Sequence, residues 1–167
     1  MKPVTACLAL MMTGCSSDGR PASAAAQPTL DLIQFFSGRS AGEGTIKIVL
    51  QDRKPLRVAS VGRAAGPGLL VLDQRITEGA EPTRMRRWQM NCTPRGRCRG
   101  SLTDATGQVR VTIGGNAARI HYEMKRGLKV EQWLVLRPDR RTLDSRLRVS
   151  KWGVTVARVD EVIRKLG

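Results

Sequence analysis

The chain has 167 residues, with 29 Lys and Arg, 14 Asp and Glu, one His and four Cys, and its net charge is +15. This length suits one domain, and a hydrophobic fraction of 41% is enough to form a core. No apolar run approaches the ~20 residues of a membrane-spanning helix, which excludes a polytopic membrane protein. With one His and no acidic cluster, we expect no metal site, no cofactor and no His-based catalytic centre.

The first fourteen residues are typical of a secretion signal, with an early cation, a short apolar stretch and then small residues before Cys15. The quartet at 12–15, Met-Thr-Gly-Cys, resembles a bacterial lipobox, in which the cysteine receives diacylglycerol and becomes the new N-terminus. We therefore expect residues 1–14 to be a lipoprotein signal peptide and Cys15 to carry the lipid. A quartet ending at Cys7 competes poorly because almost no apolar residues precede it. The alternative is an ordinary signal peptide followed by an unmodified cysteine.

Residues 15–28 are rich in Ala, Ser, Gly and Pro, which predicts a flexible tether before a folded domain at 29–167. Ser16 follows the modified cysteine, and by resemblance to bacterial lipoproteins this favours the outer membrane, facing the periplasm. There the excess of cations meets anionic lipids and envelope polymers rather than nucleic acid. The expected partners are therefore the membrane, through the N-terminal lipid anchor, and anionic envelope polymers, with no nucleic acid. Alternatively, the cations only form a solvated face.

Cys92 and Cys98 flank five residues that include the Pro and Gly of a tight turn. In an oxidising compartment this pattern predicts a disulfide across the neck of a hairpin. A redox-active pair or a metal site would need closer spacing or further ligands.

The domain is expected to start with a short helix. Asp31 and Gln34 form a capping-box pattern, and Gly38 stands where the helix would stop. The apolar face of this helix has three members: Leu32, Phe35 and Phe36.

After the helix, apolar positions recur with a period of two, in runs bounded by Gly, Pro or Asp, as in strands with one buried face. These runs lie at 46–50, 56–60, 70–76, 86–90, 99–103, 109–113, 118–124, 128–136, 143–149 and 154–162. About ten strands with short connections pair antiparallel with their neighbours. We therefore expect an all-β fold, an up-and-down antiparallel lipocalin-like β-barrel with the short N-terminal helix across one mouth. A β-sandwich is the alternative.

Several short motifs recur in an order and spacing that resemble a known family. They are Phe35, Phe36 and Gly38; Glu78 and Gly79; Arg86 and Trp88; Gly100, Asp104 and Gly107; Gly115, Asn116 and Ala117; Trp133; and Ser150, Lys151, Trp152 and Gly153. The chain resembles domain of unknown function family 3833, uncharacterised Gram-negative lipoproteins, from about residue 30 to 165. Glu78 departs from the usual Asp, and Glu131 near Trp133 is a second mild departure. The resemblance implies a barrel-like fold and a lipoprotein, but no activity.

Arg86 is in phase with Trp88 and Met90, so its side chain is expected inside the barrel. An inward Arg can bind a carboxylate or phosphate head group while apolar walls hold the chain of a ligand. Gln132 lies in the inward phase of its own strand. The candidate ligand-binding residues are thus Arg86, Trp88 and Gln132. The alternatives are an Arg satisfied by an internal acid such as Glu78, or a strand whose phase is shifted by a bulge.

These features favour a membrane-anchored binding module for a lipid, such as a fatty acid, or for another acidic amphiphile. The alternative is a structural lipoprotein with a filled barrel and a basic exterior. A lipid-acting enzyme is less favoured, because His121 is expected to face outward and Asp104 fits turn chemistry. No catalytic residue is predicted, since the sequence has no nucleophile elbow, paired carboxylates or phosphate loop.

Overall fold

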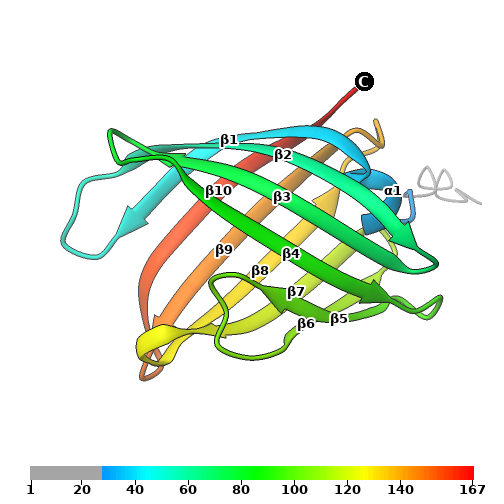
Figure 1. The fold of residues 1–167 in the computed structure, drawn as a ribbon. Helices are drawn as coiled ribbons and strands as arrows, with labels where there is room; N and C mark the ends of the chain where they lie inside the picture. The colour runs from blue at the N-terminus through cyan, green and yellow to red at the C-terminus, as the bar shows by residue number, and fades with distance from the viewer. Residues whose placement is uncertain (1–27) are drawn as a thin grey trace, which may run out of the picture.

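The computed structural model describes residues 28–167, which form ten strands, one α-helix and one 3-10 turn (Figure 1). In chain order the elements are α1 (Leu32–Phe36), β1 (Gly38–Ile48), β2 (Lys54–Gly66), β3 (Leu69–Glu78), β4 (Arg84–Cys92), β5 (Arg97–Leu102), β6 (Val109–Gly114), β7 (Ala117–Met124), η1 (Lys125–Gly127), β8 (Leu128–Leu136), β9 (Thr142–Lys151) and β10 (Val154–Leu166). The expected signal peptide and Cys15 lie outside the described residues. So does the expected tether, except Pro28, which is buried. Within residues 28–167, no helix is long and apolar enough to cross a membrane.

The strands form one closed antiparallel barrel in which each strand pairs with its sequence neighbours and β1 pairs with β10. That closing ladder runs from Arg39 opposite Leu166 to Ile48 opposite Ala157. Closure leaves no exposed sheet edge. The prediction of an up-and-down, lipocalin-like barrel is confirmed, and the β-sandwich alternative is wrong. Residues 28–167 contain the whole closed barrel and its hydrophobic clusters.

The strand nearest the N-terminus differs from the expectation. Alternation indicated a first strand at 46–50, whereas β1 begins at Gly38 and ends at Ile48. The early part of β1 contains Gly42 and Gly44, which have no side chain, so hydrophobic periodicity could not mark it. Leu50 lies in the following turn with a positive φ of 63° and is 99% exposed.

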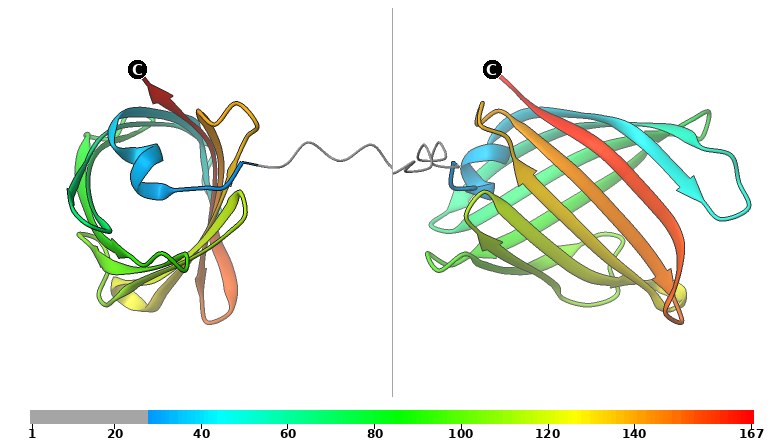
Figure 2. Two further views of the ribbon diagram at one scale, coloured as in Figure 1. Left: turned by 90° about the vertical axis from the view of Figure 1, so that its right-hand side faces the viewer. Right: turned by 180° about the vertical axis from the view of Figure 1, so that it is seen from behind.

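Helix α1 lies across one end of the barrel (Figure 2). It begins where the Asp31 carboxylate accepts a hydrogen bond from the Gln34 backbone N–H at 2.9 Å, as the capping-box pattern predicts. Its apolar side chains are buried: Leu32, Phe35 and Phe36. The Lys165 ammonium donates to three carbonyl oxygens at the helix end, those of Gln34, Phe35 and Ser37, at 2.8, 2.9 and 2.6 Å. A cation at a helix C-terminus is favourable, so Lys165 stabilises the position of α1 against β10.

The interior is packed unevenly along the barrel axis. A large cluster of buried side chains joins α1 to the adjacent half of the barrel, including Trp88, Met90, Ile120 and Leu134. The second cluster has only three buried members: Leu56, Val58 and Ile76. The end with α1 is therefore filled, and the other end is not.

Cys92 and Cys98 lie opposite each other on β4 and β5 and form the expected disulfide, with a Cα–Cα distance of 4.0 Å. Their hairpin lies at the α1 end of the barrel.

Candidate functional site

A cavity of about 620 Å³ occupies the half of the barrel away from α1. Most of its wall is apolar, and the wall residues come from strands all around the barrel: Ile46, Leu56, Val58, Ile76, Leu128, Val130, Leu147, Val149 and Val159. It extends to the connections of the open end, where Thr103, Asp104, Lys125 and Arg126 lie. We call this open end the mouth. A second space, of about 50 Å³, lies between α1 and the middle of the barrel.

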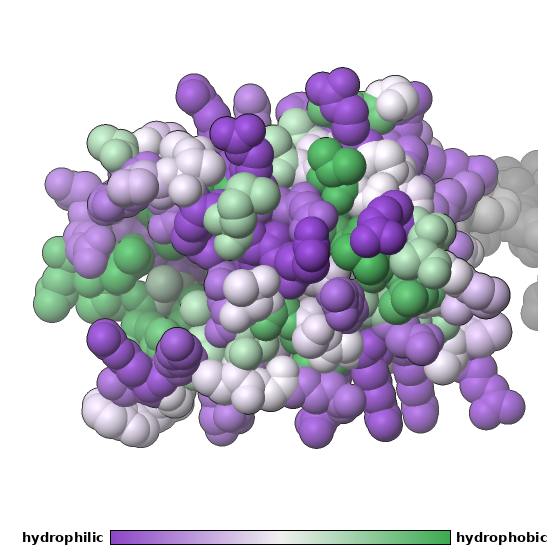
Figure 3. Space-filling view, in the orientation of Figure 1, coloured by the Kyte–Doolittle hydropathy of each residue, from purple (hydrophilic) through white to green (hydrophobic). Residues whose placement is uncertain are grey.

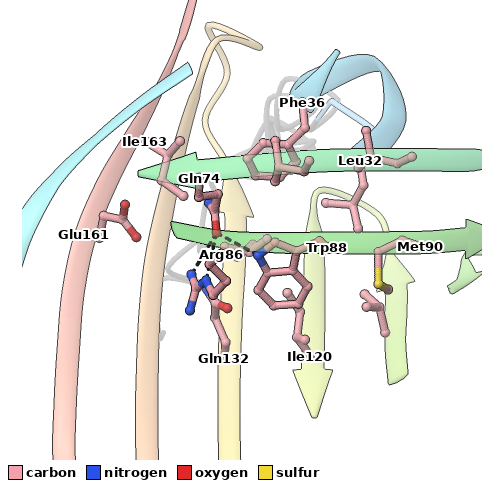
Figure 4. Close-up of a pocket in the computed structure, with 14 residues that line it drawn as sticks. Leu32, Phe36, Gln74, Arg86, Trp88, Met90, Ile120, Gln132, Glu161 and Ile163 are labelled. Carbon is pink, nitrogen blue, oxygen red and sulfur yellow. Dashed lines mark hydrogen bonds between the residues drawn. The ribbon is translucent and has the colours of Figure 1, made fainter. Parts of the chain in front are cut away.

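Six polar or partly polar side chains form a layer across the barrel between these two spaces, which we call the polar layer. They are Gln74, Arg86, Trp88, Gln132, Ser145 and Glu161. Four of its members form the floor of the large cavity, namely Arg86, Gln132, Ser145 and Glu161, while Gln74 and Trp88 line the smaller space. Several members of the layer are shown in Figure 4.

Gln74, on β3, organises one side of the polar layer. Its side-chain oxygen accepts hydrogen bonds from Arg86 Nε at 3.0 Å and from Nη2 at 2.9 Å. The same oxygen accepts from Trp88 Nε1 at 2.7 Å, and these bonds are drawn in Figure 4. The Gln74 amide nitrogen donates to Ser60 Oγ at 3.2 Å. Gln74 thus orients Arg86 through two bonds without neutralising its charge.

Arg86 faces the interior, as its phase with Trp88 predicts. Its guanidinium carbon lies 5.2 Å from the centre of the Trp88 ring, a cation–π arrangement. Within residues 28–167, no carboxylate forms an ion pair with Arg86. The internal acid considered from sequence, Glu78, instead pairs with Arg84 at 2.9 Å, and Arg84 also pairs with Asp104 at 2.8 Å. Burial lowers the pKa of the Arg86 guanidinium, which stays charged at neutral pH because an arginine pKa is so high.

Glu161 approaches Arg86 from the far side of the barrel, on β10 (Figure 4). Its carboxylate lies over Gly42 of β1, where a Cβ atom would overlap it. Burial raises the pKa of Glu161 to about 7, although the nearby Arg86 charge opposes the shift. Near neutral pH, therefore, Glu161 is protonated about half of the time and only partly offsets the charge of Arg86.

Two further contacts involve residues of the polar layer. Gln132 on β8, which lines the cavity, donates to Ser145 Oγ on β9 at 2.9 Å. Tyr122 lies edge-on to Trp88, with ring centres 5.8 Å apart, and burial raises the pKa of its hydroxyl.

Sequence reasoning placed Arg86, Trp88 and Gln132 in the interior but missed Gln74 and Glu161. The sequence does contain an indication that both face the interior, because each is a polar residue at a position where its strand alternates in phase with apolar residues. Gln74 stands between Leu72 and Ile76, and Glu161 between Val159 and Ile163. The pattern at 154–162 predicts a strand without specifying its phase, so it does not identify Glu161 as an inward acid.

Other residues considered from sequence lie outside the cavity or at its edge. His121 faces outward, with Nδ1 3.7 Å from a Glu131 carboxylate oxygen. The Trp133 ring, also outside, lies between the guanidinium groups of Arg119 and Arg148, at 5.8 and 5.5 Å from its centre. Within the described part of the chain, no three or more His, Cys, Asp or Glu side chains are grouped to hold a metal ion.

Solved structures with a similar fold include two proteins of very different sequence. A protein of unknown function from the DUF3598 family of Nostoc punctiforme PCC 73102 superposes with a TM-score of 0.64 and 14% identity, covering 84% of this chain and 51% of that one. This chain therefore spans about half the length of the Nostoc protein. The S-type phycobiliprotein lyase CPES from Guillardia theta superposes with a TM-score of 0.61 and 5% identity, covering 81% of this chain and 90% of the lyase. At these identities the likeness shows the fold alone.

A comparison with curated proteins gives no significant match. A family model described as a protein of unknown function, DUF3833, matches residues 9–165.

Proposed function

Because the chain belongs to DUF3833, a family described only as of unknown function, its function has to be argued from the site, and we propose that it binds an acidic amphiphile inside the barrel. The acidic head group contacts Arg86 on the polar layer. The apolar chain of the ligand extends through the cavity toward the mouth.

The observation that carries this proposal is an arginine at the floor of an apolar cavity that forms no ion pair within residues 28–167 and whose charge Glu161 offsets only in part. A charge inside a protein is normally paired, because desolvating it is costly. Arg86 instead has the neutral amide of Gln74 and the face of Trp88 as its contacts, with the partly protonated Glu161 across the barrel. A carboxylate or phosphate oxygen at this position would supply the missing countercharge and a charge-assisted hydrogen bond.

The cavity itself supports a ligand with a long apolar part. Its volume of about 620 Å³ lies within the range of small-molecule sites, ~300–1,000 Å³. The wall between the polar layer and the mouth contains aliphatic side chains such as Leu56, Val130 and Val149. These side chains can pack against an alkyl chain but cannot form hydrogen bonds with a polar group. The same volume argues against a structural protein with a filled barrel.

We extend the proposal to the location of the protein. An amphiphile that partitions into membranes would be met by a protein attached to one, and Cys15 is the expected site of a lipid anchor. The outer membrane, on its periplasmic face, is the location we propose.

The test compares the binding of oleic acid by residues 28–167 and by an Arg86→Met variant, measured by calorimetry. A hydrogen bond to a charged group is worth about 1.5–3 kcal/mol, so the affinity of the variant should fall about tenfold to a hundredfold. Methionine fills much of the apolar volume of the arginine stem, so the barrel should remain folded.

The matched control is Arg87→Met, on the next residue of β4. Arg87 faces outward and pairs with Asp73, so this variant makes the same change in charge and should bind oleate like the parent. Oleyl alcohol, which has the same chain without the acid, should bind the parent more weakly and should not distinguish parent from Arg86→Met. Equal binding of oleate by Arg86→Met and parent, or no binding of oleate by the parent at micromolar concentrations, would overturn the proposal.

A further inference from the structure

The rim of the mouth carries four exposed apolar side chains, which we call the rim residues. They are Val49, Leu50, Trp152 and Val154, and they are 53%, 99%, 89% and 66% exposed. They come from the β1–β2 connection and the β9–β10 turn. These two hairpins are neighbours, because β1 pairs with β10 and the Val49 backbone N–H donates to the Val156 carbonyl at 2.9 Å.

The turns themselves do not explain these side chains. Leu50 has a φ of 63°, and the turn at Trp152 and Gly153 has φ values of 50° and 82°. Left-handed conformations are favoured by Gly, Asn and Asp, whereas a side chain such as Leu or Trp is disfavoured there. Both large apolar residues therefore occupy positions where the backbone prefers small polar ones, and water surrounds them.

Cations stand beside the rim residues. The Lys151 ammonium lies 4.4 Å from the centre of the Trp152 ring. Lys125 and Arg126 form the β7–β8 connection, also at the mouth. Figure 3 shows apolar surface gathered at the left-hand end of the barrel, away from α1, with strongly hydrophilic side chains close by. Apolar tips among cations are complementary to the surface of a bilayer that contains anionic lipid.

We propose that the mouth docks on an anionic phospholipid bilayer, with Leu50 and Trp152 entering the interfacial region and Lys125, Arg126 and Lys151 contacting head groups. An indole ring with a polar N–H suits the boundary between head groups and acyl chains. Self-association through the same rim is disfavoured, because it would bring together two basic mouths of a chain with a net charge of +15. Docking would open the cavity directly toward the lipid.

The test measures co-sedimentation of residues 28–167 with large vesicles made of equal parts phosphatidylcholine and phosphatidylglycerol, without added ligand. The parent should bind these vesicles, and vesicles of phosphatidylcholine alone should bind it much less. A Leu50→Ser/Trp152→Ser variant should lose about tenfold or more in partition coefficient, since two apolar side chains no longer enter the interface. Arg86→Met should bind vesicles like the parent, which separates docking from the proposed ligand site.

Val61→Ser/Met85→Ser is the matched control, because it also removes two exposed apolar side chains, 61% and 60% exposed, but from the barrel wall. It should bind vesicles like the parent. The proposal fails if this control loses as much binding as the rim variant, or if the parent does not bind anionic vesicles. It also fails if sedimentation shows that the parent is a dimer and the rim variant is a monomer. The last result would assign the rim to a second copy of the chain.

Discussion

Gln74 is the residue on which the geometry of the polar layer depends. One neutral oxygen accepts three hydrogen bonds, two from Arg86 and one from Trp88. A glutamate at this position would neutralise Arg86 and remove the reason for an anionic ligand. The amide orients Arg86 without neutralising it, so in the proposed function the presence of Gln rather than Glu at position 74 is what leaves the charge of Arg86 for an acidic ligand.

Glu161 should make the stability of the barrel depend on pH. Its pKa in the folded protein is about 7, above the value of 4.5 expected in the unfolded chain. The unfolded state therefore loses this proton first, and the free energy of unfolding should fall as pH rises from about 4.5 to about 7, by about 3 kcal/mol in all. Glu161→Gln removes this loss, so it should be more stable than the parent at pH ~8 and similar to it at pH ~4.5, as measured by urea unfolding.

The control for this prediction is Glu123→Gln, which changes an exposed carboxyl on β7. Its profile between pH ~5 and ~8 should parallel that of the parent. Carboxyl groups whose pKa is lowered by ion pairs, such as Asp73 and Glu131, titrate below this window and act in the opposite direction. If the free energy of unfolding depended on pH in the same way in the parent and in Glu161→Gln, ionisation of the buried Glu161 carboxyl would not destabilise the fold, and the prediction would be wrong.

At the scale of elements, successive connections lie alternately at the mouth and at the end covered by α1, and these two ends of the barrel differ. The β2–β3, β4–β5, β6–β7 and β8–β9 connections lie at the end covered by α1, and the other five hairpins surround the mouth (Figure 1). Packing around α1 stabilises the first end. The disulfide of the β4–β5 hairpin is on that same side, so it is separate from the cavity.

Removing this disulfide should lower stability without affecting the site. Cys92 and Cys98 close a loop of only a few residues, for which the loss of chain entropy predicts about 2 kcal/mol of stabilisation. A Cys92→Ala/Cys98→Ala variant should thus unfold at a lower urea concentration but still bind oleate like the parent. Reduced parent protein should show a similar loss of stability. A variant that cannot fold would mean that the bridge is needed to form the hairpin, contrary to this account.

At the scale of the whole molecule, the start of the described chain and the rim residues lie at opposite ends of the barrel. The described chain enters at the α1 end, where the Leu30 backbone N–H donates to the Gly115 carbonyl at 2.8 Å. The rim residues lie at the other end. An anchor upstream of residue 28 would therefore leave the mouth free to approach lipid.

Cys15 should carry that anchor. In cells fed an alkyne-bearing palmitate, the full chain should become labelled and fractionate with the outer membrane. Cys15→Ala should lose the label, and more of the protein should appear in the soluble periplasmic fraction, because the lipid is the expected lasting attachment whereas docking of the mouth is reversible.

Cys7→Ala is the control, since this cysteine is expected to leave with the signal peptide. Its labelling should match that of the parent. Label that persists in Cys15→Ala would show that another residue carries the lipid.

In most strands the order of residues is enough to predict which side chains face the interior. In a strand, the side-chain direction alternates with each residue, so the phase of apolar positions is a local property. The positions of Arg86, Trp88 and Gln132 inside the barrel, the short helix begun at Asp31, and the disulfide within one hairpin were predictable for this reason.

The pairing of the first strand with the last, and the charges that face each other across the barrel, depend on the tertiary structure. Closure requires β1 to pair with β10 across the whole domain, and local periodicity does not encode a pairing between distant strands. That pairing brings Glu161 over Gly42 and toward Arg86, and it sets Leu50 beside the β9–β10 turn. The size of the cavity also depends on how all ten strands and α1 pack together, which is a sum over distant contacts rather than a property of any segment.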